Sequence, residues 1–355
     1  MRARRPGPRG LADAALVLTG AAAAGWLLGR VGVPSAALFG GLLAGLVRGL
    51  AGRAPLDVPR PAAAAAQAVV GISIGALVDP DTLAAIGEDW APVLLVTVAT
   101  LLLTVGAGLL LRRQPGISPV TGAFAMIAGG ASGITAMARD LGADDRMVAV
   151  LQYLRVLLIV VAMPVVATTV YGADPGAGVG AADEAGPGWP AGLLSTAACA
   201  AVGVLLARLV HLPVPALLGP LLVAAAADLG GLSGGATVPG PVEAAAFVLI
   251  GLQVGLRFTV ASLRTVGRAL LPALAVIVGL VVACAGLGVV LSAATGVSEL
   301  DAYLATTPGG LYAVLATATG TGADATFVLA VQVLRLFVML LAAPLIARRL
   351  RRRPA

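Results

Sequence analysis

Two glutamine–arginine pairs are the residues whose chemical type and spacing suggest a function. Gln152 and Arg155 lie in the segment GADDRMVAVLQYLR, and Gln332 and Arg335 hold the same positions in GADATFVLAVQVLR. Each glutamine stands three residues before its arginine, which places both side chains on one face of a helix. A guanidinium and an amide on one helix face can together bind a small anion or a carboxylate through charge-assisted hydrogen bonds.

A glycine pair precedes each of these segments, within AGGASG in the first case and TTPGGL in the second. Adjacent glycines favour a break in a helix, and irregular backbone inside a membrane is tolerated only where protein or water lines it. The backbone amides freed at each break would face the neighbouring glutamine–arginine pair. The predicted substrate-binding residues are Gly129, Gly130, Gln152, Arg155, Gly309, Gly310, Gln332 and Arg335.

Each arginine lies about nine residues into its predicted helix, roughly 13 Å along the axis at 1.5 Å per residue. An arginine near the centre of a bilayer costs on the order of 2.5–3.5 kcal/mol, so Arg155 and Arg335 must have partners. A structural role is the alternative to solute binding. Each arginine would then neutralise the carboxyl-terminal dipole of a half-helix or bind its exposed carbonyl groups. The sequence leaves both roles open.

Asp144 and Asp324 stand at the predicted starts of the helices that carry the glutamine–arginine pairs. A carboxylate at this position can accept hydrogen bonds from free backbone N–H groups and complement the helix dipole. Helix capping is the favoured role, and participation in ion coupling is the alternative.

The elements that position these residues occur twice in the chain. Gly142 and Gly322 are 180 positions apart (322 − 142), and the same separation relates the two aspartates and the two glutamine–arginine pairs. In so apolar a chain a shared alanine arises by chance, but a constant register for Asp, Gln and Arg does not. Residues 1–170 and 191–355 are therefore predicted to be homologous membrane repeats, joined by the Gly/Pro-rich linker 171–190. Further pairs in the same register are Gly71 and Gly251, Gly75 and Gly255, Pro92 and Pro272, and Pro164 and Pro344.

The composition places both repeats in a membrane. Hydrophobic residues make up 59% of the chain and charged residues only 11%, against about a quarter charged in soluble proteins, and the mean hydropathy is +1.01. Apolar runs of roughly 20 residues fit helices that span a hydrocarbon core about 30 Å thick. The predicted fold is an all-α polytopic integral membrane protein. Its apolar segments are 11–29, 33–50, 62–78, 91–111, 119–138, 147–170, 191–210, 213–229, 242–258, 269–293, 303–319 and 326–347.

The distribution of arginine predicts the orientation of the chain. Arginines cluster near both termini and around residues 48–60, 112–113 and 257–268, and loops of this kind stay cytoplasmic. The linker 171–190 carries no arginine or lysine, so it is expected on the opposite, non-cytoplasmic side. Each repeat must then cross the membrane an odd number of times. We expect about five spans per repeat plus one interrupted or re-entrant segment, 119–138 or 303–319.

Repeats with an odd number of spans are inverted in the membrane, as in many secondary transporters. The alternative is that the glycine pairs only permit close packing of true spans. Each repeat would then cross six times, and the repeats would be parallel.

Several activities lack the residues that they need. The single histidine, His211, cannot build a multi-histidine copper or zinc centre, and neither GxxxxGK[ST] nor GxSxG occurs. The net charge of +6 comes without a helix-turn-helix or a basic-aromatic face, so no direct nucleic-acid binding is expected. Cys199 and Cys284 lie in apolar segments and are predicted to be buried free thiols. We expect no enzyme activity, no metal and no cofactor.

The duplicated GG…GAD…Q-x-L-R block, with PSAALFGGLLAG and the GISIG/GLQVG pair, resembles the AbrB-type membrane protein duplication family over about residues 11–347. Members of this family are labelled as ammonia monooxygenases or as regulators of gene expression. The family looks related in topology to inverted-repeat secondary transporters. The monooxygenase label gains no support from this sequence, because copper ligands are missing. The regulator label implies an indirect effect, because no DNA-binding element is visible.

Two functions fit these features. The first is a secondary transporter, coupled to a proton or another ion, for a small solute such as an organic anion or a zwitterion, with its site at the interface of the repeats. The alternative is a membrane-embedded regulator or sensor that affects gene expression through a partner. The expected partners are the lipid bilayer, a small-molecule solute, a coupling proton or ion, and further copies of the chain in a homo-oligomer. The expected location is the cell (inner) membrane, with both termini cytoplasmic.

Overall fold

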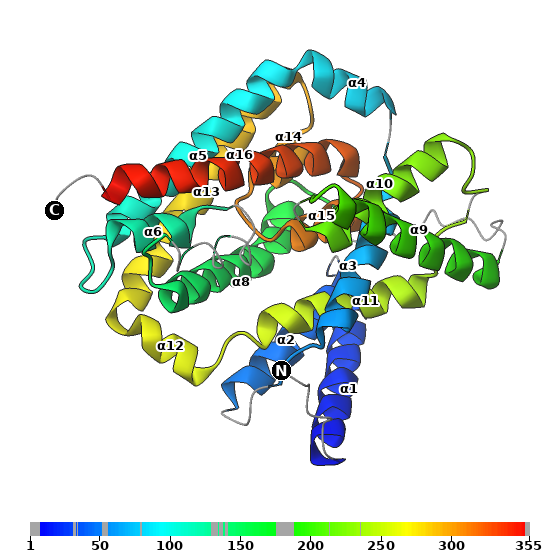
Figure 1. Cartoon of the computed structure of the whole chain (residues 1–355), viewed down its shortest axis with the longest axis horizontal. Helices are drawn as coiled ribbons and strands as arrows, with labels where there is room; N and C mark the ends of the chain where they lie inside the picture. Colours follow the sequence, from blue (N-terminus) through cyan, green and yellow to red (C-terminus); the bar gives the residue numbers. More distant parts are fainter. Residues whose placement is uncertain are drawn as a thin grey trace. The chain divides into compact units, whose positions relative to one another are not determined.

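The computed structural model describes residues 8–351, apart from residues 31–32, 34, 52–55, 79, 129–133, 135–137, 139–140, 175–187, 213 and 235. The regular elements in these residues are all helices, and no strand occurs among them (Figure 1). The predicted all-α class is thereby confirmed. The helices, including one 3-10 helix (η1), are α1 (Pro8–Arg30), α2 (Ala36–Leu50), α3 (Arg60–Gly75), α4 (Pro80–Glu88), α5 (Trp90–Leu111), α6 (Pro119–Met126), α8 (Asp145–Thr169), α9 (Trp189–Leu209), α10 (Pro215–Leu229), α11 (Gly240–Gly255), α12 (Val260–Val266), η1 (Gly267–Ala269), α13 (Leu270–Thr295), α14 (Glu299–Thr306), α15 (Leu311–Thr321) and α16 (Ala325–Arg351).

Within the described residues, six helical stretches are long and apolar enough to cross a membrane. Three of them lie in each predicted repeat. Four further apolar helices, α2, α10, α11 and α15, are shorter, with 10–17 residues each. The six long stretches are Ala12–Arg30, Trp90–Leu111, Asp145–Thr169, Trp189–Leu209, Val260–Thr295 and Ala325–Leu350.

The order of the helices repeats along the chain. Helices α2 and α10 have 15 residues each, α3 and α11 have 16, and α6 and α14 have 8. Helices α3 and α11 begin at Arg60 and Gly240, which are 180 positions apart (240 − 60), and the same separation relates the starts of α8 and α16. The register seen in the sequence therefore extends to helix boundaries. The orientation of one repeat relative to the other stays a prediction.

The chain folds into two compact units, and each unit draws on both predicted repeats. Unit 1 comprises Met1–Ala76 and Ala182–Val260, and unit 2 comprises Leu77–Ala181 and Ala261–Ala355. The predicted boundaries at residues 170 and 191 mark the sequence repeat, whereas the compact units cut across it. Residues 175–187 of the linker lie outside the described part of the chain.

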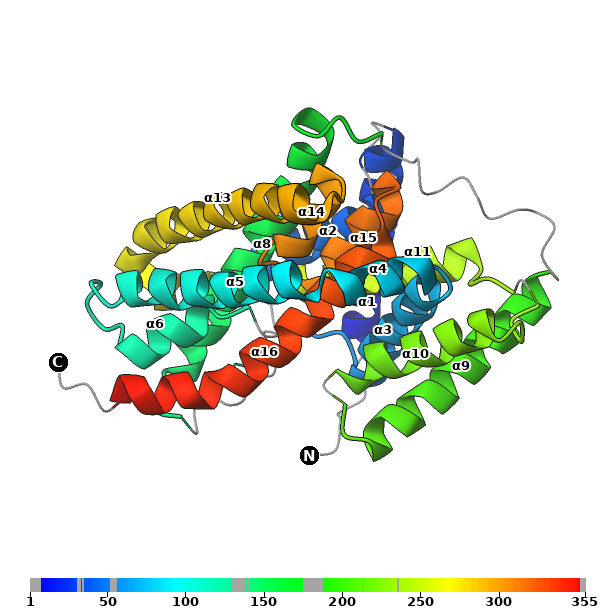
Figure 2. The same cartoon turned by 90° about the horizontal axis from the view of Figure 1, so that it is seen from above.

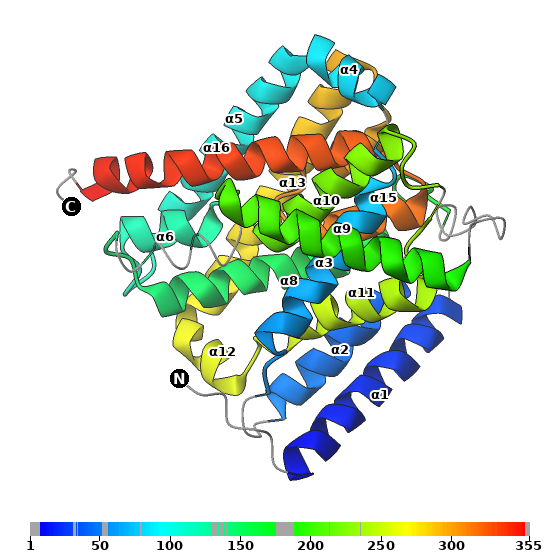
Figure 3. The same ribbon diagram turned by 45° about the vertical axis from the view of Figure 1, so that its right-hand side comes forward.

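In unit 1, the second helix of each repeat packs on the third helix of the other repeat. Helix α2 lies against α1 and α11, and α10 lies against α9 and α3 (Figure 3). A Cβ added to Gly251 would overlap the carbonyl oxygen of Leu38, and one added to Gly71 would overlap that of Leu217. The PSAALFGGLLAG segment and the GISIG/GLQVG pair are thus helix-crossing sites, where a larger residue would push the helices apart.

Unit 2 holds both glutamine–arginine pairs. Helix α5 packs on α6 and runs beside α13, while α8 contacts α6 and α15, and α16 contacts α14 (Figure 2). Two buried apolar clusters combine residues from both repeats. Phe124 and Met339 share one cluster, and Val93 and Phe327 share the other. These shared cores bring the polar residues of the two repeats into a single unit.

Candidate functional site

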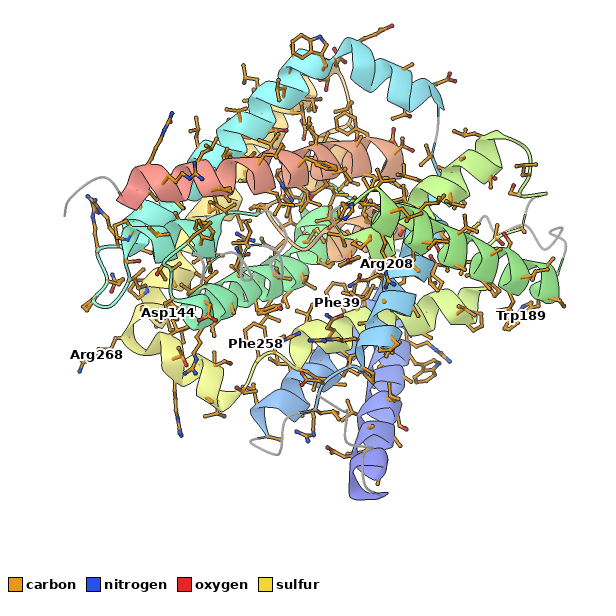
Figure 4. The ribbon with its side chains drawn as sticks, viewed as in Figure 1. Phe39, Asp144, Trp189, Arg208, Phe258 and Arg268 are labelled. Carbon is orange, nitrogen blue, oxygen red and sulfur yellow. The ribbon has the colours of Figure 1, made fainter. Side chains whose placement is uncertain are left out.

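An aspartate caps each helix that carries a glutamine–arginine pair. Asp144 Oδ1 accepts hydrogen bonds from the backbone N–H groups of Arg146 (3.0 Å) and Met147 (3.1 Å) at the start of α8 (Figure 4). Asp324 Oδ1 accepts a hydrogen bond from the backbone N–H of Phe327 (3.0 Å) near the start of α16. Both aspartates therefore have the geometry of helix N-caps.

The same aspartates tie these long helices to the short helices that precede them. The backbone N–H of Asp144 donates to Thr121 Oγ1 (3.0 Å) in the first turn of α6. The backbone N–H of Asp324 donates to Asp301 Oδ1 (2.8 Å) in the first turn of α14. Thr121 and Asp301 occupy equivalent positions in the two repeats. Thr82 Oγ1 in α4 of the first repeat also donates to Asp324 Oδ2 (3.1 Å).

Both short helices end in an extended residue. The residue after α14 is Thr307 (φ −57°, ψ 122°), and the residue after α6 is Ile127 (φ −62°, ψ 124°). Pro308 follows Thr307 directly, and a residue that precedes proline avoids the helical region. Helix α15 then begins at Leu311. The second repeat thus contains the interruption that the sequence predicts within residues 303–319.

The glycine pair of this second break lies against α8 of the first repeat. A Cβ on Gly309 would overlap the side chain of Ile159, and a Cβ on Gly310 would lie 3.2 Å from Val156 Cγ1. Val156 is the residue that follows Arg155. The break of the second repeat therefore packs next to the glutamine–arginine pair of the first, inside unit 2.

The first glutamine–arginine pair binds the end of α6. Gln152 Nε2 donates hydrogen bonds to the carbonyl oxygens of Phe124 (2.7 Å) and Ile127 (2.9 Å). Arg155 Nη1 donates to the carbonyl oxygen of Met126. Arg155 Nη2 donates to Gln152 Oε1 (2.8 Å). The pair thus shares one helix face, as its spacing predicts, and acts as one hydrogen-bonded group.

The second pair binds the end of α14 in the same way. Gln332 Nε2 donates to the carbonyl oxygens of Leu304 (2.8 Å), Ala305 (3.2 Å) and Thr307 (3.2 Å). Arg335 Nη1 donates to the carbonyl oxygen of Thr307 (2.7 Å), and its Nη2 donates to Gln332 Oε1. The two glutamine–arginine pairs therefore bind the ends of α6 and α14 through equivalent contacts.

The sequence left two roles open for these pairs, solute binding and the binding of exposed carbonyl groups at a helix end. The observed contacts are those of the second, structural role. The last carbonyl groups of a helix have no donor within the helix, and the glutamine and arginine side chains supply those donors here. The glutamine amides and the arginine Nη groups are thereby occupied by protein atoms. A guanidinium has five N–H donors, so these contacts use only part of each group.

Both guanidinium groups are buried without a compensating carboxylate among the described residues. Arg155 is 2% exposed and Arg335 is 4% exposed. The Nε atoms of both arginines are buried and have no hydrogen-bond partner. A salt bridge among the described residues joins Arg48 to Asp13, both of which belong to unit 1. Unit 2 therefore contains two buried positive charges that its described acidic residues do not pair.

Sequence reasoning did not assign a cysteine to the site, but a cysteine of unit 2 is close enough to influence both arginines. Cys284 of α13 lies within electrostatic range of Arg155 and of Arg335, and the two arginines lie within such range of each other. Cys284 is a fully buried free thiol. A sequence signal was present: the position 180 residues earlier is Thr104, which is also fully buried. Small polar residues thus occupy equivalent positions on α5 and α13.

Part of the predicted site lies outside the described residues. Gly129 and Gly130, the glycine pair of the first break, belong to this part. The structure brings together the other six predicted residues, which are Gln152, Arg155, Gly309, Gly310, Gln332 and Arg335.

Comparison with known proteins assigns the chain to one protein family. The family model described as "Transition state regulatory protein AbrB" matches residues 37–351. The chain is 36% identical over 318 residues to "Putative regulator AbrB" of Escherichia coli (strain K12), which covers 90% of each chain. It is 27% identical over 299 residues to "Uncharacterized protein YhjN" of Bacillus subtilis (strain 168), which covers 78% of this chain and 76% of the relative. The resemblance carried by the duplicated motifs is confirmed, and the chain belongs to the AbrB family.

Proposed function

We propose that this protein is a secondary transporter that carries a small organic anion or zwitterion across the cell membrane. The two repeats are inverted relative to each other, both termini are cytoplasmic, and a proton or another ion couples to the solute. The protein has no enzyme activity in this proposal. The solute site lies in unit 2, where the ends of α6 and α14 meet α8 and α16.

One observation carries the proposal: two buried guanidinium groups share a unit without a described carboxylate partner. A structural arginine inside a membrane protein usually pairs with an acidic residue or with backbone carbonyls. The ends of α6 and α14 supply carbonyls, but a helix end offsets only about half an elementary charge. A positive charge is therefore left over, and charged groups at membrane depth mark the paths of solutes and ions.

The surrounding backbone supports the same function. Interrupted helices occur in secondary transporters because the broken ends expose backbone groups to the solute at the membrane midplane. Here α14 and α15 are separated at residues 307–310, and α6 ends at the equivalent position. The duplicated helix order places one such end in each repeat. Two equivalent ends that face one site suit a carrier that opens alternately to each side.

The proposal is tested by measuring flux in proteoliposomes. Radiolabelled acetate, succinate, alanine, glutamate and ammonium are offered with and without a pH gradient. We expect saturable uptake of at least one anion or zwitterion, and Arg335→Gln should lower it at least about tenfold, because hydrogen bonds to charged groups contribute about 1.5–3 kcal/mol. Arg268→Gln is the matched control, because Arg268 is exposed in η1 of the same unit (Figure 4). Uptake by this variant should equal that of the parent protein.

Regulation of gene expression is the second candidate, and the name of the Escherichia coli relative, "Putative regulator AbrB", supports it. A regulator would bind a ligand or partner without moving a solute. Correctly inserted protein that shows no saturable flux for any of the five solutes would contradict transport and favour regulation.

A further inference from the structure

We propose that unit 1 holds a site for the headgroup of a zwitterionic phospholipid with a primary ammonium group, in a cavity beside the ends of α2 and α11. All the described residues that line this cavity belong to unit 1. Both glutamine–arginine pairs belong to unit 2, so the inference does not rest on the proposed transport function.

The cavity has a volume of about 180 Å³. Pockets for drug-sized ligands measure roughly 300–1,000 Å³, so this one fits a small polar group such as a headgroup. Its lining combines the end of α2, the loop before α3 and the turn after α11. The described residues that the argument uses are Arg48, Leu56, Asp57, Leu256, Arg257 and Thr259.

Close helix packing fixes one wall of the cavity. A Cβ added to Gly49 would overlap the carbonyl oxygen of Phe258, and one added to Gly45 would lie 2.8 Å from the carbonyl oxygen of Leu252. The end of α2 therefore packs backbone to backbone on α11 and the turn that follows it. Such packing leaves the wall little freedom to move, and a preorganised site loses less affinity to ordering.

The charged side chains of the cavity balance one another. Arg48 is 8% exposed, and its Nε (2.9 Å) and Nη2 (2.6 Å) both donate to Asp13 Oδ2. Arg257 and Asp57 are exposed and add one positive and one negative charge. Together these four residues carry no net charge. A ligand that is neutral overall but has charges of both signs matches this balance.

The two arginines favour a phosphate group. Guanidinium groups bind phosphate oxygens through paired hydrogen bonds, and the hydroxyl of Thr259 is a further polar group of the lining. Arg48 and Arg257 belong to the arginine-rich segments that we predict to be cytoplasmic. Basic pockets between membrane helices on that side bind lipid headgroups.

The other polar groups favour a primary ammonium. Asp57 supplies a carboxylate, and α2 and α11 end at Leu50 and Gly255, beside the cavity. The last carbonyl groups of a helix carry partial negative charge. The described lining contains no aromatic residue, whereas quaternary ammonium groups are recognised by aromatic side chains. A primary ammonium, which donates three hydrogen bonds, therefore fits better than a choline group or a headgroup with net negative charge.

An apolar surface next to the cavity favours a lipid over a soluble phosphate ester. Leu43, Val47 and Leu50 lie on one face of α2 and are exposed, and Val47 directly precedes Arg48. Leu256 and Leu56, which line the cavity, belong to an apolar cluster of unit 1. Acyl chains would cover this exposed face, whereas a soluble ester would leave it uncovered.

Native mass spectrometry of the purified full-length protein in detergent tests the site. Phosphatidylethanolamine, phosphatidylcholine and phosphatidylglycerol with identical acyl chains are titrated separately, and O-phosphoethanolamine supplies the first headgroup without acyl chains. We expect phosphatidylethanolamine to bind at least about threefold more tightly than the other two lipids, a size typical of exposed ion pairs. O-phosphoethanolamine should bind more weakly than any of the three.

Two variants separate the roles of the charges. Arg257→Gln should weaken the binding of all three lipids, because it removes a partner of the phosphate. Asp57→Asn should abolish the preference for phosphatidylethanolamine over phosphatidylglycerol, because it removes the partner of the ammonium. Both residues are exposed, so both variants should melt like the parent protein. Arg60→Gln is the matched control, since Arg60 is an exposed arginine at the start of α3 that is absent from the described lining; it should bind phosphatidylethanolamine like the parent protein.

Three results would overturn the site. The first is equal binding of the three lipids to the parent protein. The second is unchanged lipid binding and selectivity in both Arg257→Gln and Asp57→Asn, which would place the bound lipid on another surface. The third is binding of O-phosphoethanolamine as tight as that of the lipid, which would make the ligand a soluble phosphate ester.

Discussion

At Arg155 and Arg335, neighbouring donors of one guanidinium have different roles. The Nη groups complete the hydrogen bonding of the half-helix ends, and the Nε–H groups stay without partners. The spacing of glutamine and arginine predicted the shared helix face correctly. It could not decide between carbonyl binding and solute binding, because that depends on which turn of α6 or α14 faces the pair. The structure shows the carbonyl contacts, and the solute contact stays a prediction.

The aspartate caps lead to a prediction at the same scale. Replacing Asp144 or Asp324 by alanine removes an N-cap and should cost about 1 kcal/mol. The two variants should lower the melting temperature by similar amounts, because each carboxylate accepts two hydrogen bonds. Asp144 accepts from two backbone N–H groups, and Asp324 accepts from one backbone N–H group and the hydroxyl of Thr82. Asparagine is nearly as good an N-cap as aspartate, so Asp144→Asn should melt and transport like the parent protein. Normal melting with abolished flux in Asp144→Asn would instead show that this carboxylate couples an ion.

At the scale of the elements, the break between α14 and α15 depends on its packing against α8. The sequence predicted a break within 303–319 from the glycine pair, and Gly309 and Gly310 do lie in it. The helix ends earlier, at the Thr307–Pro308 step, for the steric reason that applies before any proline. The close approach to Ile159 could not be predicted, because it joins residues of different repeats.

This packing predicts the effect of a single methyl group. Gly309→Ala should push the break away from α8 and lower stability by about 1–3 kcal/mol, as overpacking does. Ile159→Ala creates the missing space, so the double variant should recover part of the loss in melting temperature and flux. Gly279→Ala on α13 is the matched control, since a Cβ there meets no atom within 4 Å. A loss in the double variant equal to the sum of the losses in the two single variants would contradict the contact.

At the scale of the whole chain, the repeats and the compact units are different divisions. The repeat boundary was visible in the sequence because identical residues recur in register and a Gly/Pro-rich linker separates them. The units were not visible, because they depend on helix crossings between repeats, such as α2 on α11 and α3 on α10. The glycine motifs indicated close packing, but they carry no information on which helix is the partner.

The positions of the arginines and the lengths of the helices together predict the path of the chain through the membrane. If the chain starts on the cytoplasmic side, α1 crosses outward and α2 crosses back to the arginine-rich loop around residues 48–60. Helix α3 then crosses outward again. Helix α5 then returns to Arg112 and Arg113, and α8 ends at the linker outside. Helices α2 and α3 are only about 22–24 Å long at 1.5 Å per residue, so the bilayer must thin locally around them or adjacent helices must cover their ends.

This path is tested by introducing single cysteines into a variant in which Cys199 and Cys284 are replaced by alanine. Ala181→Cys in the linker should react with a membrane-impermeant thiol reagent added to intact cells with a permeable outer envelope. Gln114→Cys, in the turn after α5, should react only after the membrane is opened. A linker cysteine that is protected in intact cells would require an even number of crossings per repeat. The repeats would then be parallel, and two equivalent half-helix ends would approach the site from the same side of the membrane, which removes the basis for alternating access through inverted repeats.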